Sequence, residues 1–264
     1  GSILTAPITI GFGGSVGLEG PMVVTGAGIS SQVARLFHIN QSDRMLLLAC
    51  ACAAALAAIF KVPLAGILFA IEVFGLDLTL SSLLPLFVAS LSGVLTSYIF
   101  FGNAALLPIY VGDSFLMHNI PFYLLLGVVG GFMSAYFTFV YEGVNRFFSK
   151  FSSAYLRIVI GGAILGLLVF VMPPLYGEGH EVINHLKAGH PELSISSNIF
   201  GWNLENPWVV ILLLGGLVLF KVVATSVTFG AGGVGGIFSP MLFMGGVMGN
   251  CFARIINQID IFPY

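Results

Sequence analysis

Apolar residues fill long runs of this chain, and polar residues are largely confined to the short stretches between them. A transmembrane helix needs roughly 20 consecutive apolar residues, and several of the runs are about that long. We expect helices over residues 3–10, 21–37, 45–60, 64–74, 81–101, 121–148, 155–172, 207–229 and 241–256. The pattern therefore predicts an all-α integral membrane protein that crosses the bilayer several times.

Two glycine-rich breaks, residues 11–21 and 230–240, interrupt the apolar pattern. Each break ends in a proline, Pro21 or Pro240, and proline is favoured in the first turn of a helix. Glycine lets the backbone adopt unusual conformations and lets a ligand come close. We therefore expect two irregular loops that each lead into a helix N-terminus, where unpaired N–H groups and the helix dipole attract anions.

Glu19 is the one carboxylate within these breaks, and it directly precedes Gly20 and Pro21. An ionisable side chain inside apolar membrane sequence is a functional candidate by default. The alternative is that Glu19 only caps the helix that follows it.

The two breaks resemble each other when they are aligned on their prolines. Residues 17–21 then lie over 236–240, and a methionine follows each proline. A Phe-Gly pair also opens each loop, at 12–13 and 229–230. Paired broken helices of this kind are typical of inverted-repeat transporters, whose half-helices point at one ion site near the membrane midplane. Chance similarity within a chain of 34 glycines is the alternative.

Composition supports a membrane location and narrows the possible partners. Charged residues make up 8% of the chain and hydrophobic residues 58%, whereas soluble domains carry roughly 25% charged residues. The net charge of −2 lacks the basic excess of a nucleic-acid-binding domain, so we expect no nucleic-acid partner. We expect Cys50, Cys52 and Cys251 to be small packing residues, because Cys50 and Cys52 lie two apart on one helix and cannot face each other.

The distribution of Lys and Arg predicts how the chain is oriented in the membrane. The connection near Arg146, Lys150 and Arg157 is the most basic, so it should lie in the cytoplasm. The connections 102–119 and 173–206 hold one Lys or Arg between them and should therefore be external. No cleavable signal peptide is visible and the chain starts and stops abruptly, which favours a piece of a longer protein.

Three segments resemble signatures of one family, the CLC chloride channels and chloride/proton antiporters. Residues 17–21, Gly-Leu-Glu-Gly-Pro, resemble the family's G-(K/R)-E-G-P signature. Residues 235–240, Gly-Gly-Ile-Phe-Ser-Pro, resemble its G-x-F-x-P signature, and residues 65–72 are similar to its P-L-A-G-x-L-F-x-x-E block. The segments follow each other in family order with hydrophobic spans between them, so the resemblance covers nearly the whole chain.

The resemblance implies a CLC-type inverted-repeat bundle of tilted and broken transmembrane helices, of which residues 1–264 form the central part of one domain. It implies a homodimer in a lipid bilayer, such as a bacterial inner membrane, in which each subunit conducts chloride or a similar small anion. No cofactor, metal or enzymatic activity is implied. Glu19 falls on the family's gating glutamate. The anion-coordinating backbone N–H groups would be those of Leu18, Glu19, Gly20, Ile237 and Phe238.

Departures from the family pattern leave the transport mechanism open. The family's G-S-G-I-P serine motif and its pore tyrosine are not in this sequence, so chloride cannot be told from other small anions. Leu18 replaces the usual basic residue, which weakens the attraction of anions to the outer mouth. Val73 lies where many antiporters carry an inner proton-transfer glutamate, which favours a channel over a proton-coupled antiporter. Glu72 is then either structural, near a helix end, or part of an inner proton route.

Other polar side chains have competing interpretations. Lys221 either snorkels to the membrane surface or pairs with a neighbour rather than binding the ion, and Ser42 is a plausible N-cap. A polar cluster in the connection 173–206 could bind a metal: Glu178, His180, Glu181 and His185. Its spacing fits no standard ligand pattern, so we expect no metal there.

Two further classes of function compete with anion conduction. An organic-anion carrier would need a Lys or Arg in the glycine-rich breaks, and neither break contains one. An intramembrane enzyme would need a polar catalytic set within the spans, such as Ser with His or paired Asp, and the spans do not show one.

Overall fold

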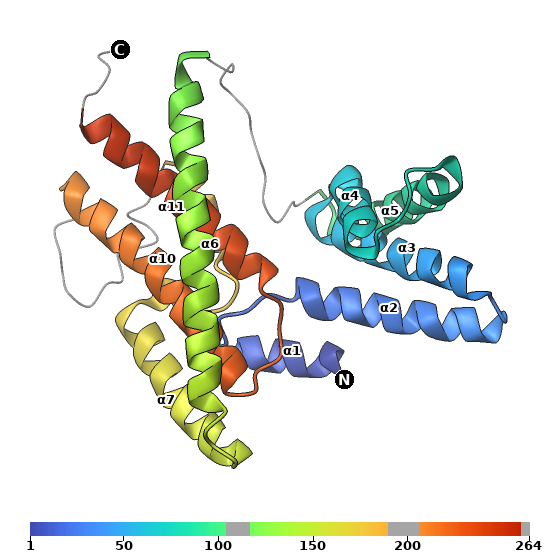
Figure 1. The fold of residues 1–264 in the computed structure, drawn as a ribbon, viewed down its shortest axis with the longest axis horizontal. Helices are drawn as coiled ribbons and strands as arrows, with labels where there is room; N and C mark the ends of the chain where they lie inside the picture. Colours follow the sequence, from blue (N-terminus) through green and yellow to red (C-terminus); the bar gives the residue numbers. More distant parts are fainter. Residues whose placement is uncertain (104–116, 190–205, 260–264) are drawn as a thin grey trace. The chain divides into compact units, whose positions relative to one another are not determined.

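The computed structural model describes residues 1–103, 117–189 and 206–259 (Figure 1). The chain divides into two compact units. The first unit consists of Gly1–Leu4 and Leu18–Pro108, and the second consists of Thr5–Gly17 and Ile109–Tyr264. The short N-terminal stretch of the second unit therefore interrupts the first unit in sequence.

Helices make up nearly all the regular structure of the described residues, as the apolar pattern predicts. The α-helices are α1 (Ser2–Gly11), α2 (Glu19–Leu36), α3 (Gln41–Phe60), α4 (Pro63–Phe74), α5 (Leu80–Phe101), α6 (Ile120–Phe148), α7 (Ala154–Val171), α8 (His180–Lys187), α10 (Pro207–Gly230) and α11 (Phe238–Gln258). The 3-10 helices are η1 (Met117–Asn119) and η2 (Pro173–Leu175). Every predicted helix is present, which confirms the all-α architecture.

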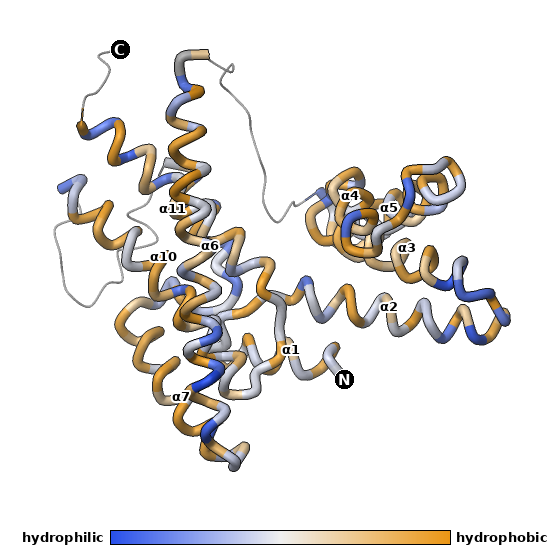
Figure 2. Tube along the Cα trace, in the orientation of Figure 1, coloured by the Kyte–Doolittle hydropathy of each residue, from blue (hydrophilic) through white to orange (hydrophobic). Residues whose placement is uncertain are grey.

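Five of these helices, α3, α5, α6, α7 and α10, are long and apolar enough to cross a membrane. Hydrophilic residues gather instead at the turn between α2 and α3 and near the end of α6 (Figure 2). This distribution matches a multi-pass membrane protein, because only the segments between spans need to reach water.

Small residues on α3 let neighbouring helices of the first unit come close to its backbone. A Cβ atom added to Gly66 of α4 would lie 2.5 Å from the carbonyl oxygen of Ala53, and one added to Gly93 of α5 would lie 2.5 Å from that of Ala54. Only glycine fits at such distances. The alanine-rich composition of α3 thus serves close helix packing, the usual role of small residues in membrane bundles.

The predicted N-cap of α3 is wrong by two residues. Asn40, not Ser42, is the cap, and its side-chain oxygen accepts a hydrogen bond from the Asp43 N–H at 2.9 Å. Asn and Ser are about equally good caps, so composition alone does not choose between them. Asn40 has the extended backbone that a cap requires, while Ser42 is already helical.

Replacing Asn40 with alanine should lower the stability of the protein by about 1 kcal/mol, because the Asp43 N–H loses its acceptor. Thermal unfolding of the purified protein in detergent measures the change. Ser42→Ala, two residues away and exposed, is the matched control and should leave the melting temperature unchanged. Equal effects of the two substitutions would contradict the assignment of the cap.

In the second unit, α10 is the central helix and packs against α6, α7 and α11. Within its most apolar stretch of 18 residues, 61% is buried inside the protein. The corresponding share is 6% in α6 and 6% in α7. At its C-terminal end, a Cβ atom added to Gly230 would lie 2.4 Å from the ring of the buried Phe148 of α6. The outer surfaces of α6 and α7 are apolar and exposed, as lipid-facing surfaces are.

The predicted polar loop 173–206 is wrong in its first half. It contains η2 and α8, and one face of α8 is buried through Val182, Ile183 and Leu186. The helix is only eight residues long and carries several charges, so it lacks the long apolar run that revealed the other helices. Residues 190–205 and most of the connection 102–119 lie outside the described residues.

Candidate functional site

The two glycine-rich breaks pair with each other through their backbones, within the second unit. Gly17 N–H donates to the Gly236 carbonyl at 2.9 Å, and Gly236 N–H donates to the Gly17 carbonyl at 2.7 Å. The pair forms an isolated antiparallel bridge. Two segments that lie 219 positions apart (236 − 17) therefore run side by side in opposite directions.

The same offset relates the turns that lead into the bridge. Gly13 and Gly232 have φ angles of 98° and 97°, a left-handed backbone that favours glycine. Gly14 N–H donates to the Thr9 carbonyl at 2.8 Å, and Gly233 N–H donates to the Thr228 carbonyl at the same distance. The resemblance of the two breaks is thus a structural repeat and not a chance excess of glycine.

Two threonines at equivalent positions of the repeat join the loops, because the hydroxyl of each one accepts a hydrogen bond from the other loop. Thr228 Oγ1 accepts a hydrogen bond from the Ser15 N–H at 3.1 Å. Thr9 Oγ1 accepts one from the Val234 N–H, also at 3.1 Å. Each threonine sits near the end of its helix and bonds a backbone N–H of the opposite loop. The two loops therefore hold each other's irregular backbone in place.

The structure corrects the register of the predicted repeat upstream of the bridge. The Phe-Gly pairs at 12–13 and 229–230 are not equivalent. They lie 217 positions apart (229 − 12), whereas the bridged residues Gly17 and Gly236 lie 219 positions apart (236 − 17). With the observed offset, Phe12 corresponds to Ala231 and Gly13 to Gly232. The register from Gly17 and Gly236 onward is as predicted.

Each partner of the bridge is followed two residues later in sequence by the first residue of a helix. α2 begins at Glu19 and has Leu18 as its N-cap residue, and α11 begins at Phe238 and has Ile237 as its N-cap residue. Both breaks are therefore shorter than predicted, since Glu19 and Phe238 are already helical. Glu19 is the first residue of α2, not its N-cap, and the N-cap position makes no side-chain capping hydrogen bond.

The residues expected to hold the anion differ in exposure. Glu19 is 2% exposed, which is unusual for a carboxylate. Ile237 and Phe238 remain 40% and 37% exposed. Helical hydrogen bonding starts in the same way in both helices, with Met22 N–H donating to Leu18 and Met241 N–H donating to Ile237, each at 3.0 Å.

Other predicted residues lie as follows. Glu72 and Val73 are neighbours in the last turn of α4, in the first unit, and both are exposed. The three cysteines are free thiols, with Cys50 and Cys52 buried in α3, as predicted.

Lys221 is fully buried in α10 and does not snorkel. Its Nζ donates to the Gly177 carbonyl at 2.7 Å and to the Leu175 carbonyl at 3.3 Å. The same nitrogen lies 4.8 Å from the centre of the Phe243 ring of α11, within the range of a cation–π contact. The prediction that Lys221 pairs with neighbours is confirmed, and its partners are backbone carbonyls and a ring.

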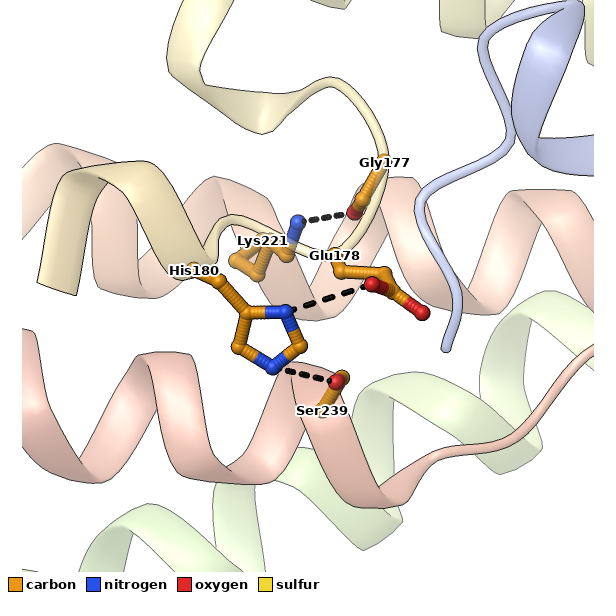
Figure 3. Close-up of polar contacts among 5 residues, drawn as sticks. All are labelled: Gly177, Glu178, His180, Lys221 and Ser239. Atoms are coloured by element: carbon orange, nitrogen blue, oxygen red, sulfur yellow. Dashed lines mark hydrogen bonds and ion pairs between the residues drawn. The ribbon is translucent and has the colours of Figure 1, made fainter. Parts of the chain in front are cut away.

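A chain of polar contacts runs from the turn before α8 to the first turn of α11 (Figure 3). Glu178 Oε2 lies 3.2 Å from His180 Nδ1, and His180 Nε2 lies 2.9 Å from Ser239 Oγ. His180 and Ser239 are buried, with exposures of 8% and 0%. Ser239 was missed in the sequence, although it lies inside the segment 235–240. Among the described residues, no group of three or more His, Cys, Asp or Glu could hold a metal ion.

Comparison with known proteins finds one matching family model and a similar solved structure. The family model described as voltage gated chloride channel matches residues 1–263. A solved structure, described as a CLC-type fluoride/proton antiporter, is similar with a TM-score of 0.71 and 23% sequence identity. The match covers 95% of this chain and 58% of that chain, so the sequence spans little more than half the length of this structural relative.

Proposed function

Because the chain belongs to the voltage-gated chloride channel family, we propose that it carries chloride or a similarly small anion across a membrane. The anion would be coordinated by backbone N–H groups of Leu18, Glu19, Gly20, Ile237 and Phe238, at the starts of α2 and α11. The observation that carries this proposal is the pair of matched glycine loops, each leading into a helix N-terminus.

Backbone N–H groups suit this role because the first turn of a helix offers donors that the helix itself cannot use. The helix dipole adds a partial positive charge at the same place. Neither contribution requires a basic side chain. The anion can therefore bind without the strong attraction of a full positive charge and can leave again. This is consistent with the lack of Lys and Arg in both breaks.

Glu19 is the proposed gate of this site. Its carboxylate is buried at the first position of α2, where a negative charge is favoured by the dipole. When it is ionised, the side chain competes with the anion for the same donors. When it takes up a proton, the competition ends and the path is open to the anion.

We further propose uncoupled, channel-like conduction, with proton-coupled antiport as the alternative. Antiport needs a titratable carrier between the inner face and Glu19, and Val73 cannot carry a proton. Glu72 and Val73 are neighbours on α4, and the side chains of neighbouring helical residues project about 100° apart around the helix axis. Glu72 therefore points in a different direction from a side chain at position 73. The antiport alternative is motivated by the fold of the fluoride/proton antiporter.

Reconstitution of the full-length protein in liposomes separates these two mechanisms. With a chloride gradient imposed and the internal pH recorded, we expect chloride to move without uphill movement of protons. Proton uptake against its gradient, in fixed ratio to chloride, would establish antiport and contradict the channel proposal. The same assay with fluoride compares the two anions, and no flux of either anion would contradict the proposed function itself. Protein-free liposomes are the control.

A further inference from the structure

We propose that Glu178, His180 and Ser239 form a relay that senses protons and turns the Ser239 hydroxyl toward or away from an anion at the start of α11. The proposal rests on the proposed anion site, because Ser239 follows Phe238 in the first turn of that helix. His180 acts through Ser239 and is therefore a positioning residue.

Glu178 determines which nitrogen of His180 carries hydrogen. An ionised carboxylate has only acceptors, and Glu178 Oε2 lies 3.2 Å from Nδ1. Nδ1 must therefore carry a hydrogen to make this contact. In a neutral imidazole, Nε2 is then the nitrogen with a lone pair.

The Ser239 hydroxyl lies 2.9 Å from Nε2 and responds to the charge of the ring. While His180 is neutral, Nε2 can only accept, so the hydroxyl must donate its hydrogen to the ring. When His180 takes a proton from water, Nε2 becomes a donor and the hydroxyl oxygen accepts from it. The hydroxyl hydrogen is then released to another acceptor. One proton thus reverses one hydrogen bond without moving a heavy atom.

The reversal matters because of where Ser239 lies. Its side chain is fully buried in the first turn of the helix whose N–H groups are proposed to bind the anion. A released hydroxyl hydrogen adds a donor at that end of the helix. Anion binding therefore becomes stronger as the pH falls, and it does so through the hydroxyl.

Glu178 is the charged side chain in contact with His180, and other charged groups lie on the elements around it. The turn before α8 provides Glu178, whose side chain is 22% exposed and offers protons a way in. α10 provides the Lys221 ammonium, which interacts electrostatically with Glu178. α8 itself carries the exposed Glu181 and, in its last turn, His185 and Lys187. α11 has no charged side chain before Arg254, near its C-terminal end. Histidine can change charge between pH 5 and 8, and His180 is the member of this set that contacts the Ser239 hydroxyl.

The test measures equilibrium chloride binding by calorimetry in the full-length protein that carries Glu19→Gln, so that Glu19 no longer titrates. We expect chloride to bind about tenfold more tightly at pH 5.5 than at pH 7.5, the effect of about one charge-assisted hydrogen bond. Adding Ser239→Ala or His180→Gln should reduce this pH effect to less than about twofold. Ser239→Thr keeps the hydroxyl and should restore it.

His185→Gln is the matched control, since it removes another histidine of α8 that has no place in the relay, and the tenfold effect should persist. If His180→Gln does not fold, Glu178→Gln replaces it and should move the change in affinity to lower pH, because the carboxylate charge no longer favours the imidazolium. Thermal unfolding reports folding for each variant.

Two outcomes would overturn the relay while leaving the anion site intact. One is chloride affinity that is independent of pH in Glu19→Gln. The other is a pH effect that survives Ser239→Ala and disappears in His180→Gln, since the imidazolium would then act by charge alone and not through the hydroxyl. Failure of every variant, and of the unmodified protein, to bind chloride at either pH would instead contradict the proposed function.

Discussion

Glu19→Gln, introduced together with Ser239→Ala in the full-length protein, should leave chloride flux that no longer responds to pH. Glutamine keeps the size of the side chain but cannot ionise, so it cannot compete with the anion in a pH-dependent way. The unmodified protein should conduct more at low pH, by a factor of about 5 to 150, the usual size of coupling between two bound species. The variant should vary by less than about twofold, as measured by chloride efflux from liposomes between pH 5 and 7.5.

Ser239→Ala separates this prediction from the relay of His180, because that relay changes anion affinity only through the Ser239 hydroxyl. Glu142→Gln is the control, because Glu142 forms an exposed ion pair with Arg146 at 3.0 Å and lies in α6. It should keep the full pH response. If Glu19→Gln conducts with the same pH dependence as the unmodified protein, Glu19 is not the gate.

Lys221→Met is expected to have the largest effect on stability. Methionine has a similar length but no donor, so the carbonyls of Leu175 and Gly177 would lose the ammonium that binds them inside the protein. Leaving buried acceptors unsatisfied costs about 1–3 kcal/mol each, so we expect a loss of roughly 3 kcal/mol. Thermal unfolding in detergent measures it as a drop in melting temperature.

Lys150→Met, in the exposed turn between α6 and α7, removes a lysine without removing a buried contact and should unfold like the unmodified protein. Burying the Lys221 charge costs free energy in itself, so the contacts of its ammonium must outweigh that cost if the lysine stabilises the protein. If Lys221→Met is as stable as the unmodified protein, the ammonium does not hold the turn at Leu175 and Gly177.

The helices and the paired loops were predictable because their signals are strong. Runs of about 20 apolar residues match the thickness of a bilayer and seldom occur elsewhere. A proline after a glycine-rich loop marks a helix start in a way that depends on backbone sterics alone. The downstream register of the repeat followed from Pro21 and Pro240. Its upstream register did not, because a Phe-Gly pair has no structural requirement comparable to the positive φ of Gly13 and Gly232.

What escaped prediction depends on contacts between distant segments. α8 is short and polar, so its buried face is visible only once α11 packs against it. The partners of Lys221 are backbone carbonyls, which no side-chain pattern can reveal. His180 and Glu178 were grouped as possible metal ligands because they are close in sequence, whereas the contact of His180 with Ser239 joins residues 59 positions apart.

The bridge between Gly17 and Gly236 also limits how the protein can be assembled during its synthesis. The residues Thr5–Gly17 belong to the second unit, yet their partners are made 219 positions later (236 − 17). At roughly 5–20 residues per second, a ribosome needs about 10 to 45 s to reach them. During that interval the first loop has to wait in the membrane without Thr228, Val234 or Gly236. Chaperones or insertion factors that shield unpaired backbone should therefore act on the nascent chain at this early loop.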